Sequence, residues 1–497
     1  MISPMSTRQI ATSTLWQIGS QLTMAALSVI SVKFIAIGLS KELAGAYNSA
    51  YGYLQLFAIL ADFGLYAVSV REVSSSKNPE RVLGCLIVLR SIIAVLSLGT
   101  ALVIAWIVPA WYGTPLRIGI TIASLVPFFT LLAGVLRTLF QVQYKMHLVF
   151  IAEVTQRILT ASLMGVIIFL GIRLSTDVSV YYSFIAIGAL GAVVLFILSL
   201  FFSVRLTRIR PCFDRPLLTS LLKKAMPYGV AFLCIALYRQ FDLTLIALLR
   251  DDFAIQNAEY GFASRIAEMT YIIPTFLLNS TLPILADRHD RGEKTDTLLG
   301  KTLFLILLLG SLSASFSILW ARPLMGLLTT DAYLSLPSSP GADTALALLG
   351  MPMFFNGIVL FSFYTLLTKH AWQTLVSRMV IAVVLSLSLN YFLIARFGFV
   401  GATVTSTIVH LFLAATLLPA ALRVLPISFP VSYAVQWVLF TVILSVALYL
   451  SLPLLTTTIA SVIGVVIAGV SLPILAFSLG FHRMFAFGRA SEDIAQI

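Results

Sequence analysis

The sequence predicts an all-α, polytopic membrane protein with about fourteen transmembrane helices. Of its 497 residues, 59% are hydrophobic and only 10% are charged, and the mean hydropathy is +1.01. Soluble proteins carry about 25% charged residues, so this amount of apolar surface requires a lipid environment. Apolar runs of about 20 residues, the length of a helix that crosses a bilayer, recur along the whole chain.

Twelve of the predicted spans form two sets of six. The first set covers residues 14–38, 44–68, 83–108, 118–140, 148–171 and 180–204. The second set covers residues 226–249, 259–285, 301–321, 344–367, 374–395 and 400–422. Two further spans, 431–452 and 456–480, contain no Lys, Arg, Asp or Glu, so we expect them at the periphery of the protein, facing lipid.

Basic residues alternate from loop to loop, as the positive-inside rule requires. With the N-terminus in the cytoplasm, 18 of the 32 Lys and Arg residues fall in cytoplasmic segments. The opposite side receives one base per loop: Lys41, Arg117, Arg173, Arg250, Arg322 and Arg396. We therefore expect a multi-pass membrane protein with both termini in the cytoplasm.

The most basic stretch, residues 205–224 (RLTRIRPCFDRPLLTSLLKK), separates the two sets of six spans. Similar segments lie at the second and eighth spans, AGAYNSAYGYLQ and NAEYGFASRIAE, which align through Tyr47 and Tyr260. An even number of spans in each half predicts parallel repeats about an axis along the membrane normal, with a site between them. The expected domains are an N-terminal lobe (1–204), a cytoplasmic linker (205–224), a C-terminal lobe (225–425), and two extra helices with a cytoplasmic tail (426–497).

Ionisable residues inside the predicted spans are the candidate site. Each costs at least ~2.5–3.5 kcal/mol to insert into a bilayer, so such residues usually face a cavity or a partner. A guanidinium group can bind a pyrophosphate through two parallel hydrogen bonds. The bases proposed to bind substrate are Lys33, Arg90, Arg157, Arg239 and Arg265, and the acids proposed for ion coupling or structural neutralisation are Asp62, Asp242, Glu153 and Glu268.

Spacing predicts how some of these charges pair. Three acid–base pairs lie three or four residues apart, which places both members on one helix face: Glu153–Arg157, Arg239–Asp242 and Arg265–Glu268. Each pair either neutralises itself so that the helix can insert or serves transport. Asp62 has no local partner, so it either pairs with a base on another helix or takes part in ion coupling. Arg137 lies near a span end and is expected to extend to the cytoplasmic interface.

Aromatic residues gather near the predicted outer ends of the spans. They are Phe34, Tyr47, Tyr51, Tyr53, Trp106, Trp111 and Tyr112. Aromatic belts are typical of membrane interfaces, and this is the interpretation we favour over stacking on sugar rings.

Several other function classes are not supported. The net charge of +12 indicates contact with membrane lipids rather than nucleic acid, because no soluble basic domain is present. The cysteines Cys85, Cys212 and Cys234 lack metal-ligand spacing, and Asp251–Asp252 lies in a short outer loop. No external loop is long enough to house enzymatic chemistry. We therefore expect neither an enzyme nor a cofactor, apart from a coupling H+ or Na+.

Three segments resemble a known family. The Leu43–Arg81 segment contains DFGL at Asp62–Leu65 followed by an Arg71-Glu72 pair. Asp242 is followed by YGFASRI from Tyr260, and NYFLI from Asn390 precedes FGFVGA. Together these segments resemble bacterial polysaccharide flippases of the multidrug/oligosaccharidyl-lipid/polysaccharide exporter superfamily, over nearly the whole chain.

The resemblance implies a V-shaped, two-lobe transporter of the bacterial inner membrane that works by alternating access. From the acids inside the spans we expect transport to be coupled to an ion. Its substrate would be an undecaprenyl-pyrophosphate-linked repeat unit of O-antigen, capsule or exopolysaccharide. Its partners would be this lipid-linked oligosaccharide, membrane lipids, and polysaccharide polymerase or assembly proteins. Carried over by motif, Asp62, Arg71, Asp242 and Arg265 would be functional.

Three alternatives remain open at this stage. One is a multidrug or cation extruder of the same superfamily, which would usually have twelve helices and an acid-rich cavity. Another is a lipid II flippase of related fold, and the third is a membrane glycosyltransferase or polymerase. The two extra helices and the bases in both halves favour a lipid-linked substrate.

Overall fold

The computed structural model describes residues 7–76, 78–207, 210–290, 296–369, 371–425 and 427–481. The helices are α1 (Thr7–Gly38), α2 (Lys41–Asp62), α3 (Leu65–Ser75), α4 (Pro79–Ile107), α5 (Leu116–Ala123), α6 (Leu125–Val142), α7 (Met146–Phe169), α8 (Val178–Leu206), α9 (Arg215–Arg239), α10 (Asp242–Leu249), α11 (Phe253–Asp290), α12 (Asp296–Leu319), α13 (Ala321–Leu328), α14 (Ala342–Thr368), α15 (Trp372–Phe397), α16 (Phe399–Val424), α17 (Val431–Ser451) and α18 (Thr458–Ser478). Within these ranges, the only β-type pairing consists of two isolated bridges, and no β-strand is formed. The predicted all-α fold class is confirmed.

Among the described residues, 11 helical segments are long and apolar enough to cross a membrane. They correspond to the predicted spans from 83–108 onward, except for 259–285, which lies in α11. The first span is represented by a shorter apolar stretch, Thr23–Gly38 of α1, and the second by α2. The protein is therefore a multi-pass membrane protein, and the number of fourteen spans stays a prediction.

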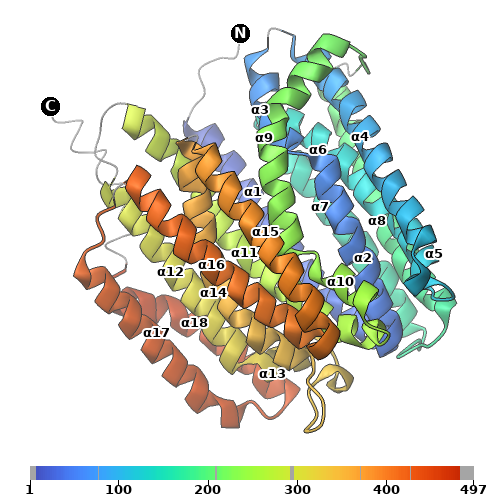
Figure 1. The fold of residues 1–497 in the computed structure, drawn as a ribbon, viewed down its shortest axis with the longest axis vertical. Helices are drawn as coiled ribbons and strands as arrows, with labels where there is room; N and C mark the ends of the chain where they lie inside the picture. Colours follow the sequence, from blue (N-terminus) through green and yellow to red (C-terminus); the bar gives the residue numbers. More distant parts are fainter. Residues whose placement is uncertain are drawn as a thin grey trace. The chain divides into compact units, whose positions relative to one another are not determined.

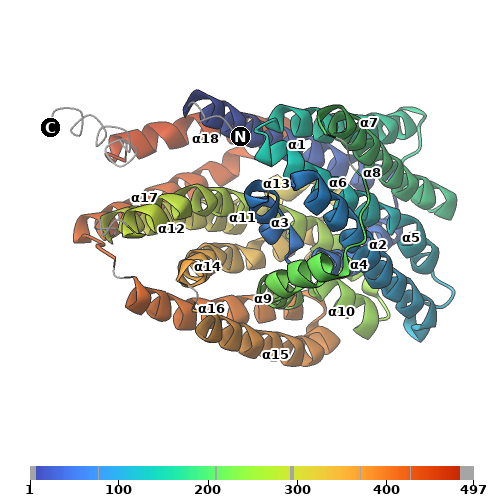
Figure 2. The same cartoon turned by 90° about the horizontal axis from the view of Figure 1, so that it is seen from above.

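The described helices group into two compact units. Unit 1 comprises Met1–Phe262, Leu328–Ala332 and Met379–Ala402, and unit 2 comprises Ala263–Leu327, Tyr333–Arg378 and Thr403–Ile497. In unit 1, α1 packs on α7, α6 and α7 pack on α8, and α2 packs on α4, α5 and α9. Figures 1 and 2 show these helices, coloured from blue to green, lying side by side. The predicted division into lobes at residues 204 and 225 stays a prediction.

Besides the span predicted at 118–140, which is divided at Ser124 between α5 and α6, two of the predicted spans are each broken into two helices. The span predicted at 44–68 ends at Asp62 and restarts at Leu65, because Phe63 and Gly64 have φ angles of 40° and 71°. Gly64 lies against α9, where an added Cβ would be 2.7 Å from Cβ of Tyr228, and glycine tolerates both the close approach and the positive φ. The span predicted at 226–249 is interrupted between α9 and α10. Hydropathy does not detect either break.

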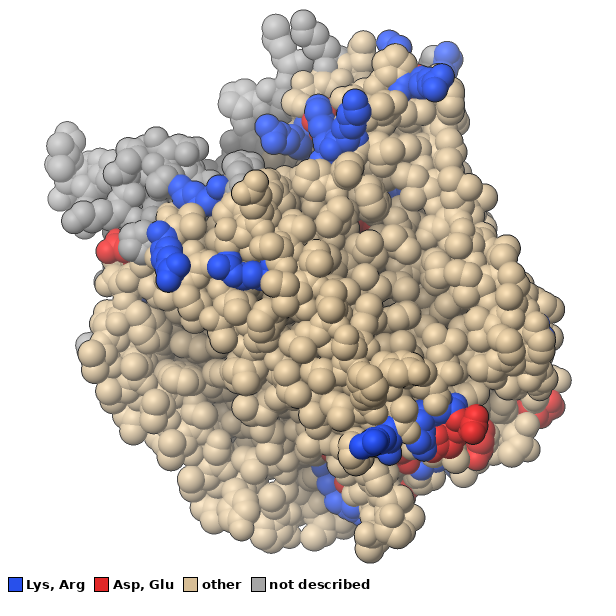
Figure 3. Space-filling view, viewed as in Figure 1, with Lys and Arg blue, Asp and Glu red and all other residues tan. Residues whose placement is uncertain are grey.

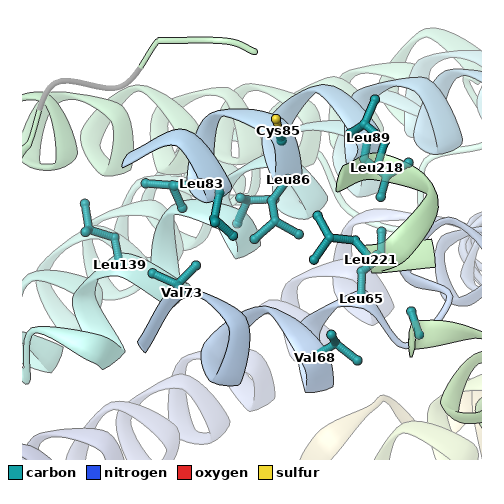
Figure 4. Packing of buried hydrophobic residues seen from close by; sticks show 13 residues of the cluster. Leu65, Val68, Val73, Leu83, Cys85, Leu86, Leu89, Leu139, Leu218 and Leu221 are labelled. Carbon is teal, nitrogen blue, oxygen red and sulfur yellow. The ribbon is translucent and has the colours of Figure 1, made fainter. Parts of the chain in front are cut away.

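A buried apolar cluster joins the beginning of α9 to three helices of the first half (Figure 4). It comprises Leu65, Val68 and Val73 of α3, Leu83, Leu86 and Leu89 of α4, Leu139 of α6, and Leu218 and Leu221 of α9. Close van der Waals packing of this kind is the main source of helix association inside a bilayer, where lipid offers little hydrophobic driving force. Helix α9, which begins inside the predicted linker 205–224, is thereby held in unit 1.

In unit 2, α12 packs on both α14 and α17. Only 17% of the apolar window in α17 and 6% of that in α18 is buried, against 67% in α14. The prediction that the last two spans are peripheral and face lipid agrees with this difference.

Charged side chains visible in Figure 3 lie near helix ends within each unit, and the broad surface between them shows almost no Lys, Arg, Asp or Glu. This distribution suits helices that cross a bilayer. Six of the bases predicted to be cytoplasmic lie outside the described residues: Lys77, Arg208, Arg291, Lys294, Arg483 and Arg489. The orientation of the chain in the membrane stays a prediction.

Candidate functional site

Asp242 is a buried carboxylate at the break between α9 and α10. Its side chain lies among three elements, and the residue is only 3% exposed. The Tyr260 hydroxyl of α11 donates a hydrogen bond to Oδ2 at 2.7 Å, and Nδ2 of Asn390 on α15 donates to Oδ1 at 2.8 Å. Within the described residues, Asp242 forms no ion pair. Two neutral donors compensate a buried charge only in part, so binding a proton or a small cation would stabilise this site.

Asn390 adds a second oxygen to the same place. Its Oδ1 atom is buried and has no hydrogen-bond partner in the described part of the chain. Residues 242, 260 and 390 all belong to unit 1, although Asn390 comes from a helix far along the sequence. The sequence analysis did not select Asn390 or Tyr260 as site residues. The only available signal was their presence in the segments that carry the family resemblance.

Arg239 is the last residue of α9 and is half-buried. The spacing prediction placed it on one helix face with Asp242, but the helix ends between them at Gln240 and Phe241. The prediction of a shared helix face is therefore wrong here. The two groups remain close in sequence at the same break, with a guanidinium ending one helix and a carboxylate beginning the next.

Asp62 pairs with Arg90, a base on another helix. The pair joins the C-terminal end of α2 to the middle of α4, through Nη2 of Arg90 and Oδ1 of Asp62. Arg90 is 4% exposed, and its Nε and Nη1 atoms are buried without a partner among the described residues. Gly134 of α6 lies beside the guanidinium, and a Cβ there would make an ordinary contact of 3.8 Å with Nη2. Arg90 therefore keeps donors that a phosphate or a water molecule can satisfy.

The pairing of Asp62 with Arg90 can be tested by a double-mutant cycle. We expect Asp62→Asn to lower the free energy of unfolding by about 3 kcal/mol, because it leaves a buried guanidinium without its counter-ion. The double variant Asp62→Asn with Arg90→Gln should lose less than the sum of the two single variants. Thermal unfolding of the purified protein, followed by tryptophan fluorescence, measures both effects. Strictly additive losses would show that the pair contributes no coupling energy.

Glu153 bonds two residues that the spacing rule did not select. Nη1 of Arg137 on α6 lies 2.8 Å from Oε1, and the Ser20 hydroxyl of α1 donates to Oε2 at 2.7 Å. The expectation that Arg137 extends to the interface is wrong, since its guanidinium is 2.8 Å from a carboxylate on a neighbouring helix. Arg157 is half-buried on α7, one turn after Glu153. Glu153 thus links α1, α6 and α7 within unit 1.

The remaining predicted residues are dispersed. Nζ of Lys33 on α1 donates to the carbonyl oxygen of Thr329, in the short segment Leu328–Ala332 that belongs to unit 1. Arg265 is half-buried and Glu268 is exposed, and both lie on the part of α11 in unit 2. Arg71, implied by the family resemblance, is exposed on α3. Among the contacts described, Asp62–Arg90 is the one that joins two predicted site residues.

The two repeated segments recognised in the sequence pack against each other at a glycine-rich contact. A Cβ on Gly45 of α2 would lie 1.5 Å from the carbonyl oxygen of Ala254 on α11. A Cβ on Gly261 would lie 2.5 Å from Nδ2 of Asn48. Only glycine allows backbones to approach this closely, as at other packed helix pairs in membranes.

Hydrogen bonds and an ion pair reinforce this contact between α2 and α11. Nδ2 of Asn48 donates to the carbonyl of Asn257 at 3.0 Å, and Nδ2 of Asn257 donates to the Ser49 hydroxyl at 2.8 Å. Nζ of Lys41 lies 2.5 Å from Oε1 of Glu259. We call this group the repeat seam: Lys41, Gly45, Asn48, Ser49, Ala254, Asn257, Glu259 and Gly261. The seam joins the first half of the sequence to the second.

Exposure separates the residues of the predicted aromatic belt into two groups. Trp106 and Tyr112 are 49% and 56% exposed, and the Arg117 guanidinium stacks on both rings. In contrast, Tyr53 and Trp111 are 4% and 1% exposed, and their polar atoms donate to backbone carbonyls of Ala101 and Ala247. Tyr47 is likewise buried. These three rings pack inside unit 1 because each meets a neighbouring helix.

Asp252, one of the two acids in the loop before α11, has a structural role. Arg250 binds both carboxylate oxygens of Asp252 through Nε at 2.8 Å and Nη2 at 3.0 Å, and Gln256 donates a third bond at 3.1 Å. These bonds hold the pKa of Asp252 below its usual value. The described residues contain no cluster of three or more metal-ligating side chains. The interpretation of Asp251–Asp252 as an ordinary outer loop is consistent with this geometry.

The sequence matches a known protein family. The sequence profile of a family described as "Polysaccharide biosynthesis protein" matches residues 10–289. No curated protein sequence matches the chain significantly.

Three solved structures share the fold. The lipid II flippase MurJ in an inward closed conformation superposes with a TM-score of 0.68 at 15% identity, covering 96% of this chain and 100% of that one. An inward-facing multidrug resistance MATE transporter of the MOP superfamily gives 0.62 at 13% identity, with 81% and 94% coverage. The MATE multidrug transporter DinF-BH gives 0.59 at 15% identity, with 84% and 95% coverage. All three are transporters or flippases.

Proposed function

The chain belongs to the polysaccharide biosynthesis protein family, and from this premise we propose that it flips an undecaprenyl-pyrophosphate-linked oligosaccharide repeat unit across the inner membrane. Its fold is also found in MOP-superfamily transporters, which supports transport across the membrane rather than an enzymatic reaction. The flipping would proceed by alternating access, with the diphosphate held by guanidinium groups inside the membrane.

The observation that supports this function best is that a guanidinium and a carboxylate flank the same break, between α9 and α10. Arg239 is a half-buried guanidinium that ends α9, and Asp242 is a buried carboxylate that begins α10 without an ion pair among the described residues. A guanidinium can bind a diphosphate, and a buried carboxylate can bind the coupling ion. Placing both at one interruption of a membrane helix would let substrate binding and ion binding influence each other.

The coupling ion is proposed to be H+ or Na+, bound at Asp242. The carboxylate and the unpartnered Oδ1 of Asn390 supply two oxygens, and no other acid is needed to hold a single charge. Asp62 and Glu153 are paired with Arg90 and Arg137, so we assign them a structural role. No resident cofactor is proposed.

The repeat seam gives alternating access a physical basis. In this structure the seam is closed by glycine contacts, amide hydrogen bonds and the Lys41–Glu259 ion pair. It connects a helix of the first half with one of the second, and opening it would require these groups to separate. We propose that the seam forms the outer gate, since both helices begin at predicted outer ends.

The direct test of the function uses leaflet-specific labelling of the lipid-linked glycan. In cells that lack the protein, we expect the repeat unit to remain on the cytoplasmic side, out of reach of an external lectin. Arg239→Ala and Arg265→Ala should also abolish flipping while the protein still inserts into the membrane. Arg205→Ala is the matched control, because this guanidinium stacks on Phe201 at a helix end.

The same experiment separates the proposal from other transport functions. Normal glycan flipping in both Arg239→Ala and Arg265→Ala would remove these residues from the mechanism. Accumulation of lipid II rather than the oligosaccharide would assign the protein to cell-wall synthesis, and loss of drug efflux alone would assign it to multidrug export. The expected partners are polysaccharide polymerase or assembly proteins. Both termini of this chain are expected to lie in the cytoplasm.

A further inference from the structure

The first turns of α9 present a basic groove that the proposed transport path does not use. The groove has a volume of about 650 Å³ and is lined by Arg215, Pro216, Thr219, Ser220, Lys223 and Lys224. These residues form two adjacent rows on the helix surface, each with a spacing of four residues, and eight residues of helix extend about 12 Å. Among the described residues, the lining contains three bases and no acid.

The groove lies on the face of α9 opposite its buried face. Leu218, Leu221 and Ala225 pack into the cluster of Figure 4, whereas all six lining residues are exposed. Figure 3 shows basic side chains gathered near the beginning of α9. The groove is therefore held by a rigid backbone but open to what surrounds the protein.

The bases of the groove are available to an anion. Arg215 and Lys223 make no ion pair with any described residue. Lys224 donates one bond to Glu72 at 2.7 Å and remains 51% exposed, which leaves two of its three donors. The nearby acid Asp214 is committed to Arg81 at 2.7 Å and to capping α9. The net charge of the groove is thus positive, and the Ser220 hydroxyl adds another donor.

Apolar side chains border the groove at the same level. Leu222 and Met226 are 38% and 57% exposed on the neighbouring row of α9, and Phe213 just before the helix is 73% exposed. A membrane-crossing helix that begins with exposed bases beside exposed apolar groups matches the boundary between lipid headgroups and acyl chains. A soluble anion would use the bases but leave the apolar border unexplained.

From this arrangement we infer that the α9 groove binds the phosphodiester headgroup of an anionic phospholipid. The phosphate would lie between Arg215 and Lys223, one turn on either side of Thr219, and the acyl chains would lie along Leu222 and Met226. Because α9 continues from this groove to Arg239 at its other end, a bound lipid would stabilise the position of the helix on which the transport residues lie.

Native mass spectrometry of the full-length protein tests the inference. We expect retained adducts of dioleoylphosphatidylglycerol and far fewer of dioleoylphosphatidylcholine. The double variant Arg215→Gln/Lys223→Gln should bind phosphatidylglycerol about tenfold more weakly or worse, since each base near an anionic lipid strengthens binding about fivefold. The control Arg205→Gln/Arg210→Gln removes the same charge from the same basic segment outside the groove, and its binding should remain close to that of the unmodified protein.

Two outcomes would overturn the inference. Equal losses in the two double variants would mean that general positive charge, not the groove, attracts the lipid. Displacement of phosphatidylglycerol by an equal concentration of undecaprenyl diphosphate would assign the groove to the transported carrier. If the first double variant fails to fold, Ser220→Trp fills the groove without changing its charge and should weaken binding in the same way. Unchanged phosphatidylglycerol binding in Ser220→Trp would likewise contradict the inference that the lipid binds in the groove.

Discussion

Asp242→Asn is expected to reduce ion-driven flipping to the level of vesicles without the protein. Asparagine preserves the size of the side chain but cannot bind a proton or balance the charge of a cation. One of its two terminal atoms is also a donor, so it can no longer accept from both Tyr260 and Asn390. The measurement is flipping of a fluorescent lipid-linked oligosaccharide in proteoliposomes, with an imposed H+ gradient and an imposed Na+ gradient in separate experiments.

Tyr260→Phe is the matched control for this prediction. It removes the 2.7 Å hydrogen bond to the carboxylate but keeps the carboxylate itself. We expect this variant to remain coupled, with a changed dependence on ion concentration. Unimpaired, gradient-dependent flipping in Asp242→Asn would exclude Asp242 as the coupling group. A response to only one of the two gradients in the unmodified protein would identify the ion.

Gly45→Leu is expected to prevent the repeat seam from closing. A Cβ at this position would lie 1.5 Å from a backbone oxygen, so no side-chain rotation relieves the clash and the two helices must separate. Overpacking of this kind costs about 3 kcal/mol or more. A bias of about 1.4 kcal/mol already shifts a two-state population tenfold, so flipping should fall to about one tenth or less.

Accessibility of the seam provides a second readout for Gly45→Leu. With the three native cysteines replaced, a cysteine at the buried Ser49 position should react slowly with a membrane-impermeant maleimide, and Gly45→Leu should accelerate this reaction. Gly99→Leu on α4 is the control, because nothing lies within 4 Å of a Cβ there. Unchanged labelling and flipping in Gly45→Leu would show that the seam does not gate transport. Gly261→Ala should have a milder effect, since the nearest atom belongs to the Asn48 side chain.

The charged residues show where reasoning from sequence succeeds and where it stops. The insertion cost of a charge selected Asp62 and Arg90 correctly as unusual residues, but it could not pair them, because they lie on different helices. The spacing rule assigned Glu153 to Arg157, whereas the structure brings Arg137 and Ser20 to its carboxylate. Local spacing describes neighbours on one helix, while inside a membrane the partner is as often on the next helix.

The repeat seam is a second case in which the sequence does not predict which helices contact each other. The similarity of AGAYNSAYGYLQ to NAEYGFASRIAE was visible in the sequence, and it indicated two related halves. That the two segments touch, with Asn48 donating to the Asn257 carbonyl and Asn257 donating to Ser49, could not be derived from it. A repeat predicts equivalent positions in two halves, and only packing decides which of these positions meet.

The sequence by itself determined the fold class, the approximate positions of the spans and the peripheral place of the last two helices. These properties follow from how much apolar surface each segment carries, which is a local quantity. Only the tertiary structure decided the interruptions at Phe63–Gly64 and between Arg239 and Asp242, the partners of the buried charges, and the site formed by Asp242, Tyr260 and Asn390. These depend on the close approach of segments that are distant along the chain, and hydropathy does not record which helices pack together.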